Sequence, residues 1–240
     1  MSKIIPLNNE IHNKLKVITS TDYSRFKNQH LIPVIAQDFL TLATEFPIVF
    51  VKNSETEQFI SVAMMGIKNG INLYCQDKHW TSAVTPIAFN NAPLSLTKPS
   101  PDGEEVMVCF DESSPLVSES NGEALFNDNG EQSNYLKQRS QMLVQVADAT
   151  MQTQAIVQYF AEKGLLVAKQ LTVKLANEQE PFVVNGAYII DEQALNSLTT
   201  EEFVLLRSKG LLPLIYAHLT SLHQITRLAR KQDQLDNQGR

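Results

Sequence analysis

The chain has 240 residues, of which 43% are hydrophobic and 19% are charged, and its formal net charge is -6. This length can bury a sizeable core, and the composition is typical of a globular protein and not of a disordered one. The negative net charge argues against a general nucleic-acid binder, because such a protein needs basic surface to neutralise phosphates. We therefore expect no nucleic-acid partner.

The first residues, MSKIIPLNNEIHNKL, contain no apolar run of the length that a signal peptide needs. No stretch reaches roughly 18 consecutive apolar residues, so no transmembrane segment is expected and the expected location is the cytoplasm. Cys75 and Cys109 are the only cysteines, and each lies in an apolar, strand-like run. Two cysteines cannot form a zinc site alone, so buried free thiols are expected, with a cross-strand disulfide as the alternative.

Residues 1–30 are polar and mixed, and we expect an irregular N-terminal segment there. Apolar residues then recur at three- and four-residue steps from Ile32 to Phe46, which predicts an amphipathic helix ended by Pro47. Three runs rich in β-branched and aromatic residues follow, separated by turn residues, and predict an antiparallel meander: PIVFVKN, QFISVAMMGI and INLYCQD. A long proline-bearing loop with room for one edge strand comes next, and EEVMVCFDESS returns to strand character.

The second half of the chain is predicted to be mostly helical. One long helix, or two in series, runs between an N-cap at Ser133 and a C-terminal Gly164. Two strands follow, QLTVKLA and PFVVNGAYIID, and then a helix with a capping box formed by Thr199 and Glu202. A last helix covers PLIYAHLTSLHQITRLARKQ, and its segment RLARK, the densest basic cluster, is interpreted as a solvated helix end.

These elements predict an α+β fold, with an antiparallel sheet from the first half packed with helices mostly from the second half. No internal repeat and no low-complexity linker divides the chain. We therefore expect a single domain over residues 31–232, followed by a flexible C-terminal tail over residues 233–240.

The segment SNGEALFNDNGEQSNYL carries the residue types of a calcium loop. If Gly130 takes the sixth position of an EF-hand loop, Leu125 and Leu136 take the first and twelfth positions, where neither can ligate. Two Asn-Gly turns, at Asn121 and Asn129, around a short strand explain the segment better. Nine acidic residues and no Lys or Arg lie between residues 102 and 131, which we interpret as a solvated face, although it could attract a cation or a basic partner.

The only tryptophan, Trp80, follows His79 in the proline-bearing loop. Such a residue either seals a core or contacts a ligand, and both interpretations stay open. We expect Trp80 to be partly buried at the border of a cleft, with Asn72 and Asn90 as polar neighbours. His218 and His223 are five residues apart on a helix and thus too far rotated to chelate one ion, so they are expected to be structural or solvated. No catalytic signature is present, and we assign no catalytic residue, metal or cofactor.

Several short motifs, taken in their order and spacing, resemble the SapC family of bacterial proteins, named after genes linked to surface-array (S-layer) proteins. They are EFPIVF, GIKNGINLY, Trp80, Pro86 with Pro93, ALFNDNGE, IIDEQALNSL and GLLPLIYAHLTSL. The chain departs from the family after Trp80, where Val84, Asn90 and Leu94 replace an aromatic residue, an Arg and a Phe. If that Arg binds an anionic ligand in the family, this chain lacks the contact.

The resemblance implies an accessory or binding protein, non-catalytic and linked to surface-layer or envelope biology. The alternatives are an enzyme or enzyme subunit with an unfamiliar site near His79 and Trp80, and a structural component of the S-layer. The partner, a small molecule or a protein, and the oligomeric state are left undefined by the sequence.

Overall fold

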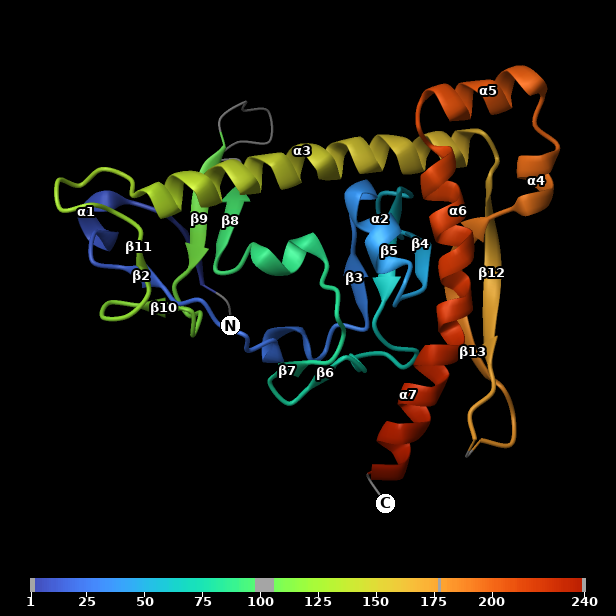
Figure 1. The fold of residues 1–240 in the computed structure, drawn as a ribbon, viewed down its shortest axis with the longest axis horizontal. Coiled ribbons are helices and arrows are strands. Elements are labelled where there is room, and N and C mark those ends of the chain that lie inside the picture. The colour runs from blue at the N-terminus through green and yellow to red at the C-terminus, as the bar shows by residue number, and fades with distance from the viewer. Residues whose placement is uncertain (1–2, 98–105, 177, 239–240) are drawn as a thin grey trace. The chain divides into compact units, whose positions relative to one another are not determined.

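The computed structural model describes residues 3–97, 106–176 and 178–238 (Figure 1). Its contacts group the chain into two compact units. The first unit combines Met1–Thr21 with Ile87–Asp148, and the second unit combines Asp22–Pro86 with Ala149–Arg240. Each unit is thus built from segments far apart in the sequence, and each is described by itself.

The first unit contains two small antiparallel sheets, of strand order β1-β9-β8 and β10-β2-β11. The strands are β1 (Ile4–Pro6), β2 (Lys16–Val17), β8 (Leu94–Thr97), β9 (Met107–Asp111), β10 (Val117–Ser118) and β11 (Glu123–Ala124). A short helix and a 3-10 turn accompany them, α1 (Asn9–His12) and η3 (Ile87–Asn90). The N-terminal segment therefore supplies strands to both sheets, which corrects the irregular entry predicted for residues 1–30.

An apolar cluster is buried in the first unit. Leu94 and Phe110, from paired strands, lie in it with Leu125 and Phe126 and with Leu136 at the start of the long helix. Leu125, Phe110 and Leu136 are fully buried. This burial explains why the sequence places leucine where a calcium loop would need oxygen ligands.

Both Asn-Gly turns are confirmed. Gly122 and Gly130 adopt left-handed φ values of 107° and 80°, which glycine tolerates best. The short strand β11 lies between them, and an isolated bridge joins Phe126 to Gln132. The Ser133 hydroxyl accepts from the backbone N–H of Leu136, as an N-cap should.

Most of the acidic run is exposed where the structure describes it, although Asp111 on β9 is half-buried. Glu112, Glu119, Glu123, Asp128 and Glu131 are exposed, which agrees with a solvated face. Three further members of the run, Asp102, Glu104 and Glu105, lie outside the described residues. Among described residues, no group of three His, Cys, Asp or Glu side chains is arranged to hold a metal ion.

A five-stranded antiparallel sheet of order β12-β13-β4-β5-β3 organises the second unit (Figure 1). Its strands are β3 (Leu31–Pro33), β4 (Ile48–Lys52), β5 (Phe59–Met64), β12 (Leu166–Val173) and β13 (Phe182–Ile190). A separate hairpin pairs β6 (Cys75–Gln76) with β7 (His79–Trp80). The predicted α+β fold with antiparallel strands is confirmed.

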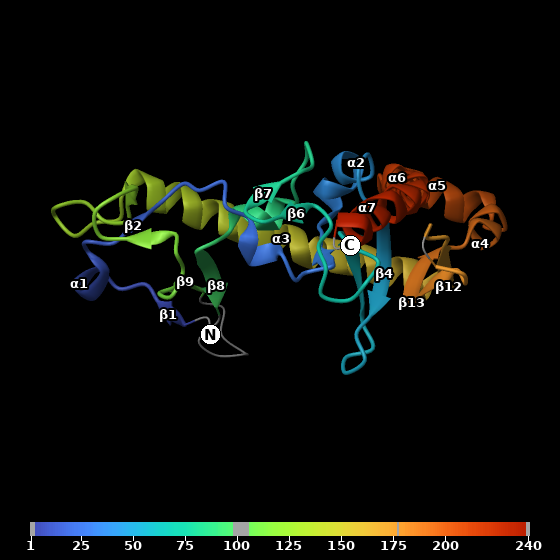
Figure 2. The same ribbon diagram turned by 90° about the horizontal axis from the view of Figure 1, so that it is seen from below.

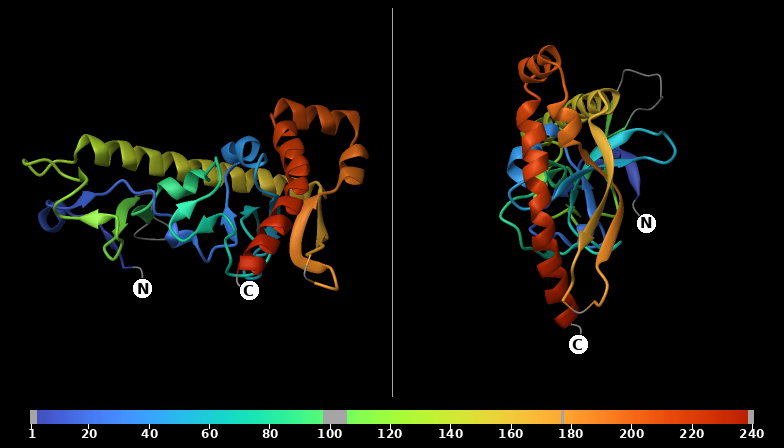
Figure 3. Two further views of the ribbon diagram at one scale, coloured as in Figure 1. Left: turned by 60° about the horizontal axis from the view of Figure 1, so that its bottom comes forward. Right: turned by 90° about the vertical axis from the view of Figure 1, so that its right-hand side faces the viewer.

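The helices of the described chain lie mostly in its second half. Besides α1 and η3, they are α2 (Phe39–Leu42), α3 (Asn134–Glu162), α4 (Glu192–Asn196), α5 (Thr200–Ser208), α6 (Leu212–Ser221) and α7 (Ile225–Gln238), with 3-10 turns η1 (Ser24–Phe26), η2 (Ala36–Asp38) and η4 (Leu222–Gln224). Figure 2 shows α2 beside α6, and Figure 3 shows α6 and α7 following one another along the β12–β13 hairpin. None of the helices described is long and apolar enough to cross a membrane.

The predicted helix from Ile32 to Phe46 is largely wrong. Ile32 pairs with Ala63 as part of β3, and only Phe39–Leu42 is α-helical. Polar contacts hold the intervening backbone, because the N–H of Ile35 donates to Asp38 and that of Ala36 donates to the Thr153 hydroxyl at 2.8 Å.

The last helix is also interrupted, since the turn η4 separates α6 from α7. The segment RLARK lies in the first half of α7 and not at its end, and Leu228 and Ala229 within it are buried. The interpretation of RLARK as a solvated helix end is therefore wrong. Residues 233–238, predicted to be a flexible tail, continue α7, while residues 239 and 240 lie outside the described chain. The division into domains stays a prediction.

His218 attaches α6 to the sheet. Its buried ring contacts the carbonyl oxygen of Ile48 through Nδ1 at 2.8 Å and accepts from the N–H of Ile190 through Nε2 at 3.0 Å. The neutral tautomer protonated on Nδ1 satisfies both partners. Burial lowers the pKa of His218 to about 4, against a smaller opposing effect of the Ile48 carbonyl. His218 is thus structural, as predicted.

Candidate functional site

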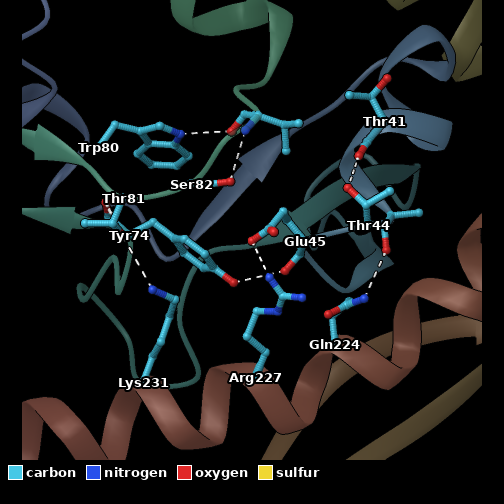
Figure 4. Close-up of polar contacts among 12 residues, drawn as sticks. Thr41, Thr44, Glu45, Tyr74, Trp80, Thr81, Ser82, Gln224, Arg227 and Lys231 are labelled. Carbon is cyan, nitrogen blue, oxygen red and sulfur yellow. Dashed lines mark hydrogen bonds and ion pairs between the residues drawn. The ribbon is translucent and has the colours of Figure 1, made fainter.

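The β6–β7 hairpin of the second unit places the only tryptophan. Cys75 is the register partner of Trp80, and His79 is exposed at the tip. The indole N–H of Trp80 donates to the carbonyl oxygen of Val84 at 2.9 Å, so the polar edge of the half-buried ring is satisfied within its own loop (Figure 4). Val84, one of the departures from the family pattern, thus contributes its backbone there.

Trp80 packs within an aromatic cluster. Its ring centroid lies 5.8 Å from that of Tyr23, 6.0 Å from that of Phe46 and 5.8 Å from that of Tyr74. Phe46 and Tyr74 make an edge-to-face contact at 4.6 Å, and both are fully buried. Trp80 therefore covers a packed core on one side and keeps part of its surface in solvent, as expected of a partly buried residue.

Beneath Trp80, Tyr74 connects the hairpin to α7. The Tyr74 hydroxyl donates to the carbonyl oxygen of Glu45 at 2.9 Å, and the Glu45 carboxylate forms an ion pair with Arg227 at 2.6 Å (Figure 4). Burial, with the nearby Glu45 charge, raises the pKa of Tyr74 well above its ordinary value. The phenol therefore stays neutral and acts as a hydrogen-bond donor.

Lys231 lies one helical turn after Arg227, on the same face of α7. Its ammonium group sits 4.5 Å from the centroid of the Tyr74 ring, and it approaches the Thr81 hydroxyl at 3.5 Å (Figure 4). Burial lowers the pKa of Lys231, the Glu45 carboxylate raises it, and the Arg227 charge lowers it further. The ammonium is held chiefly by the electron-rich face of an aromatic ring.

A cleft of about 500 Å³ adjoins this cluster within the second unit. Its described lining combines cationic, amide and apolar groups with one carboxylate: Lys27, Asn28, Gly70, Ile71, Asn72, Leu73, Cys75, Asp77, Lys231, Leu235 and Gln238. This volume is in the range of small-molecule sites, and such sites combine apolar walls with a few polar groups.

Two lining residues serve the fold. The buried amide of Asn72 donates to the carbonyl oxygen of Phe26 at 3.1 Å and accepts from the N–H of Tyr74 at 3.0 Å. The Cys75 thiol is buried against the carbonyl oxygen of Tyr23 at 3.1 Å, and burial raises its pKa, which disfavours the reactive thiolate. Cys75 and Cys109 are both free and buried, as predicted.

The sequence-predicted site residues are only partly brought together. Asn72 lines the cleft. Trp80 packs against Tyr74 and is not among the described residues that line the cleft, and His79 is exposed on the hairpin. Asn90 belongs to the first unit, where it is exposed on η3 and its carbonyl oxygen accepts a hydrogen bond from Arg139. A recognition role for these four residues stays a prediction.

Sequence reasoning missed Lys231. The signal was present in RLARK, because Arg227 and Lys231 are four residues apart and the intervening Leu228 and Ala229 are apolar. That pattern describes a helix whose basic residues flank a buried stripe, so part of each basic side chain faces the protein body.

Fold and cleft together define an α+β protein that carries an amphipathic cleft in its second unit. The family model named SapC matches residues 7–228, and the chain belongs to the SapC family. The match begins at residue 7, before EFPIVF, the first of the motifs that carry the resemblance, and so includes the N-terminal segment with β2. Comparison with curated proteins and with solved structures gave no match.

Proposed function

We propose that this SapC-family protein is a binding or accessory protein that holds a small molecule in the cleft of its second unit without transforming it. The observation that carries the proposal is the cleft itself, with the half-buried Lys231 at its wall. Asn72 at the wall, and Tyr74 and Glu45 in the cluster beside it, are engaged in fixed structural contacts, the first two through hydrogen bonds and Glu45 through Arg227. Groups held in such contacts are poorly placed to act as a general acid or base, which must reach the proton that it transfers.

The link to surface-layer or envelope biology is a second part of the proposal and rests on the family name. Fractionation of cells tests it. An accessory protein is expected in the cytoplasmic fraction, whereas recovery with the extracted surface lattice would support a structural role.

Equilibrium dialysis against a small-molecule extract tests binding in the cleft. We expect compounds to be retained by the wild-type protein, lost from the Leu235→Asp variant, and recovered chemically unchanged. Leu235 is suited to this test because it lines the cleft and is 39% exposed, so its replacement leaves the core intact. Conversion of a retained compound in excess over the protein would favour the alternative of an enzyme near His79 and Trp80.

A further inference from the structure

The charge at the cleft is unevenly balanced. Lys231 forms no ion pair with a carboxylate among the described residues, and the carboxylate that most influences it, Glu45, already pairs with Arg227 at 2.6 Å. Lys68, in the same unit, provides a comparison, because its ammonium lies 3.4 Å from Glu178 and 3.2 Å from Asp236. Two carboxylates thus neutralise Lys68, whereas the half-buried Lys231 has no carboxylate partner among the described residues.

A partly desolvated ammonium without a counterion is costly, and the Tyr74 ring offsets only part of that cost. An anion entering the cleft would restore the missing charge partner. Lys27 lines the same cleft and adds a second positive charge, against the single carboxylate, that of Asp77, among the described lining residues. The described part of the lining therefore carries a net positive charge on a protein whose formal net charge is -6.

The remaining walls specify the rest of a ligand. Ile71, Leu73 and Leu235 provide apolar surface, and an ideal Cβ placed on Gly70 would meet no atom within 4 Å, so the wall is open there. An apolar body gains free energy from covering such surface. A second cleft, of about 590 Å³ in the first unit, has Glu10 as its only charged residue among the described lining. Its charge does not favour an anion.

We infer that the cleft of the second unit binds a small organic anion with an apolar body, whose anionic group pairs with Lys231. The inference rests on the proposed binding function and names the chemical class of its ligand. A carboxylate and a phosphate ester both satisfy this chemistry, because an ammonium recognises either as a point charge.

Four probes with one octyl chain separate the headgroups: octanoate, octyl phosphate, octanol and octylammonium. Binding is measured by isothermal titration calorimetry and by Trp80 fluorescence, since Trp80 contacts Tyr74 and Tyr74 contacts Lys231. We expect octanoate or octyl phosphate to bind at least tenfold more tightly than octanol, and octylammonium to bind most weakly. The stronger of the two anions identifies the headgroup.

The Lys231→Met variant removes the charge and keeps most of the aliphatic length. We expect it to weaken binding of the preferred anion about tenfold and to leave octanol unchanged. Lys209→Met is the matched control, because the ammonium of Lys209 also lies over an aromatic ring, 5.6 Å from the centroid of Tyr159, but does not line the cleft. This control should bind every probe as the wild-type protein does.

The inference is overturned if octanol or octylammonium binds as tightly as both anions, or if Lys231→Met behaves as Lys209→Met does. Should Lys231→Met fail to fold, Lys27→Met, at an exposed position, carries the charge test, and an unchanged anion affinity would then overturn the inference. A natural ligand that is retained unchanged but neutral would refute the anion while the binding function stands. Turnover of an anionic ligand would refute the binding function while the anion preference stands.

Discussion

Acidification is expected to destabilise the second unit through His218. The buried ring accepts a hydrogen bond from the N–H of Ile190 through Nε2, so a proton on Nε2 removes that acceptor and places a charge in the core. The pKa of His218 is about 4 in the folded protein, against about 6.5 for a histidine in an unfolded chain. Between these values the unfolded state binds the additional proton.

The effect of pH on the unfolding free energy follows from the difference between the folded-state and unfolded-state pKa values of His218. A lowered folded-state pKa gives stability that is fully present above pH ~6.5 and is lost as the pH falls toward about 4. A difference of roughly 2.5 pKa units at 1.36 kcal/mol per unit corresponds to about 3 kcal/mol. This is a large fraction of the stability of an ordinary domain.

Urea unfolding measured from pH 7 to pH 4 tests this prediction, with His218→Gln as the reference. A glutamine amide can donate to the carbonyl oxygen of Ile48 and accept from the N–H of Ile190, but it does not titrate in this range. The unfolding free energy of the wild-type protein relative to that of His218→Gln should fall by about 3 kcal/mol between pH 7 and pH 4. Taking this difference removes the contribution of the carboxylates, because both proteins contain them. A difference that is independent of pH would refute the reasoning.

Three further outcomes are expected. Thermal melts with calcium and with a chelator should coincide, because Leu125 and Leu136 are buried apolar residues, and a shift of several degrees would contradict the turn interpretation. Truncation before Gly210 should give insoluble protein, since it removes the buried Ile215 and the His218 attachment, and a soluble, cooperatively melting fragment would show that the helix is dispensable. Trp80→Ala should lower the unfolding free energy by about 2 kcal/mol, which is less than the loss expected for truncation of a fully buried aromatic side chain. The fluorescence of Trp80 in the wild-type protein should be partly quenched by acrylamide. Blue-shifted emission without quenching would show instead that Trp80 is a core residue.

The sequence predicted the parts of the fold that rest on local periodicity. The runs around Ile48–Lys52 and Phe59–Met64 form adjacent strands, and the two later runs form the β12–β13 hairpin. These strands are joined by short connections, and their β-branched and aromatic residues suit a pleated surface. The capping box of Thr199 and Glu202 is present at the start of α5, since capping depends on residues three apart.

Long-range pairing accounts for what the sequence did not predict. Ile4 pairs with Asp111 across more than a hundred residues, and no local pattern in a polar N-terminal segment indicates that partner. In the segment from Ile32 to Phe46, the sequence pattern predicted which residues are buried but not the backbone conformation. Its predicted apolar positions, Val34, Ile35, Phe39, Leu42 and Phe46, are all buried although most of the segment is not α-helical. The spacing of the apolar residues therefore predicted their burial correctly and the α-helical backbone incorrectly.

The same distinction applies to the candidate site. A basic residue in a sequence gives its charge, whereas its function depends on whether a counterion accompanies it in the fold. Arg227 and Lys231 look alike in RLARK, yet Arg227 pairs with Glu45 and Lys231 faces a tyrosine ring and a cleft. Because the charge of Arg227 is already balanced, replacing it should mainly reduce stability, whereas replacing Lys231 should mainly reduce anion binding. That contrast between neighbouring turns of one helix ties the proposed chemistry to the geometry of the cleft.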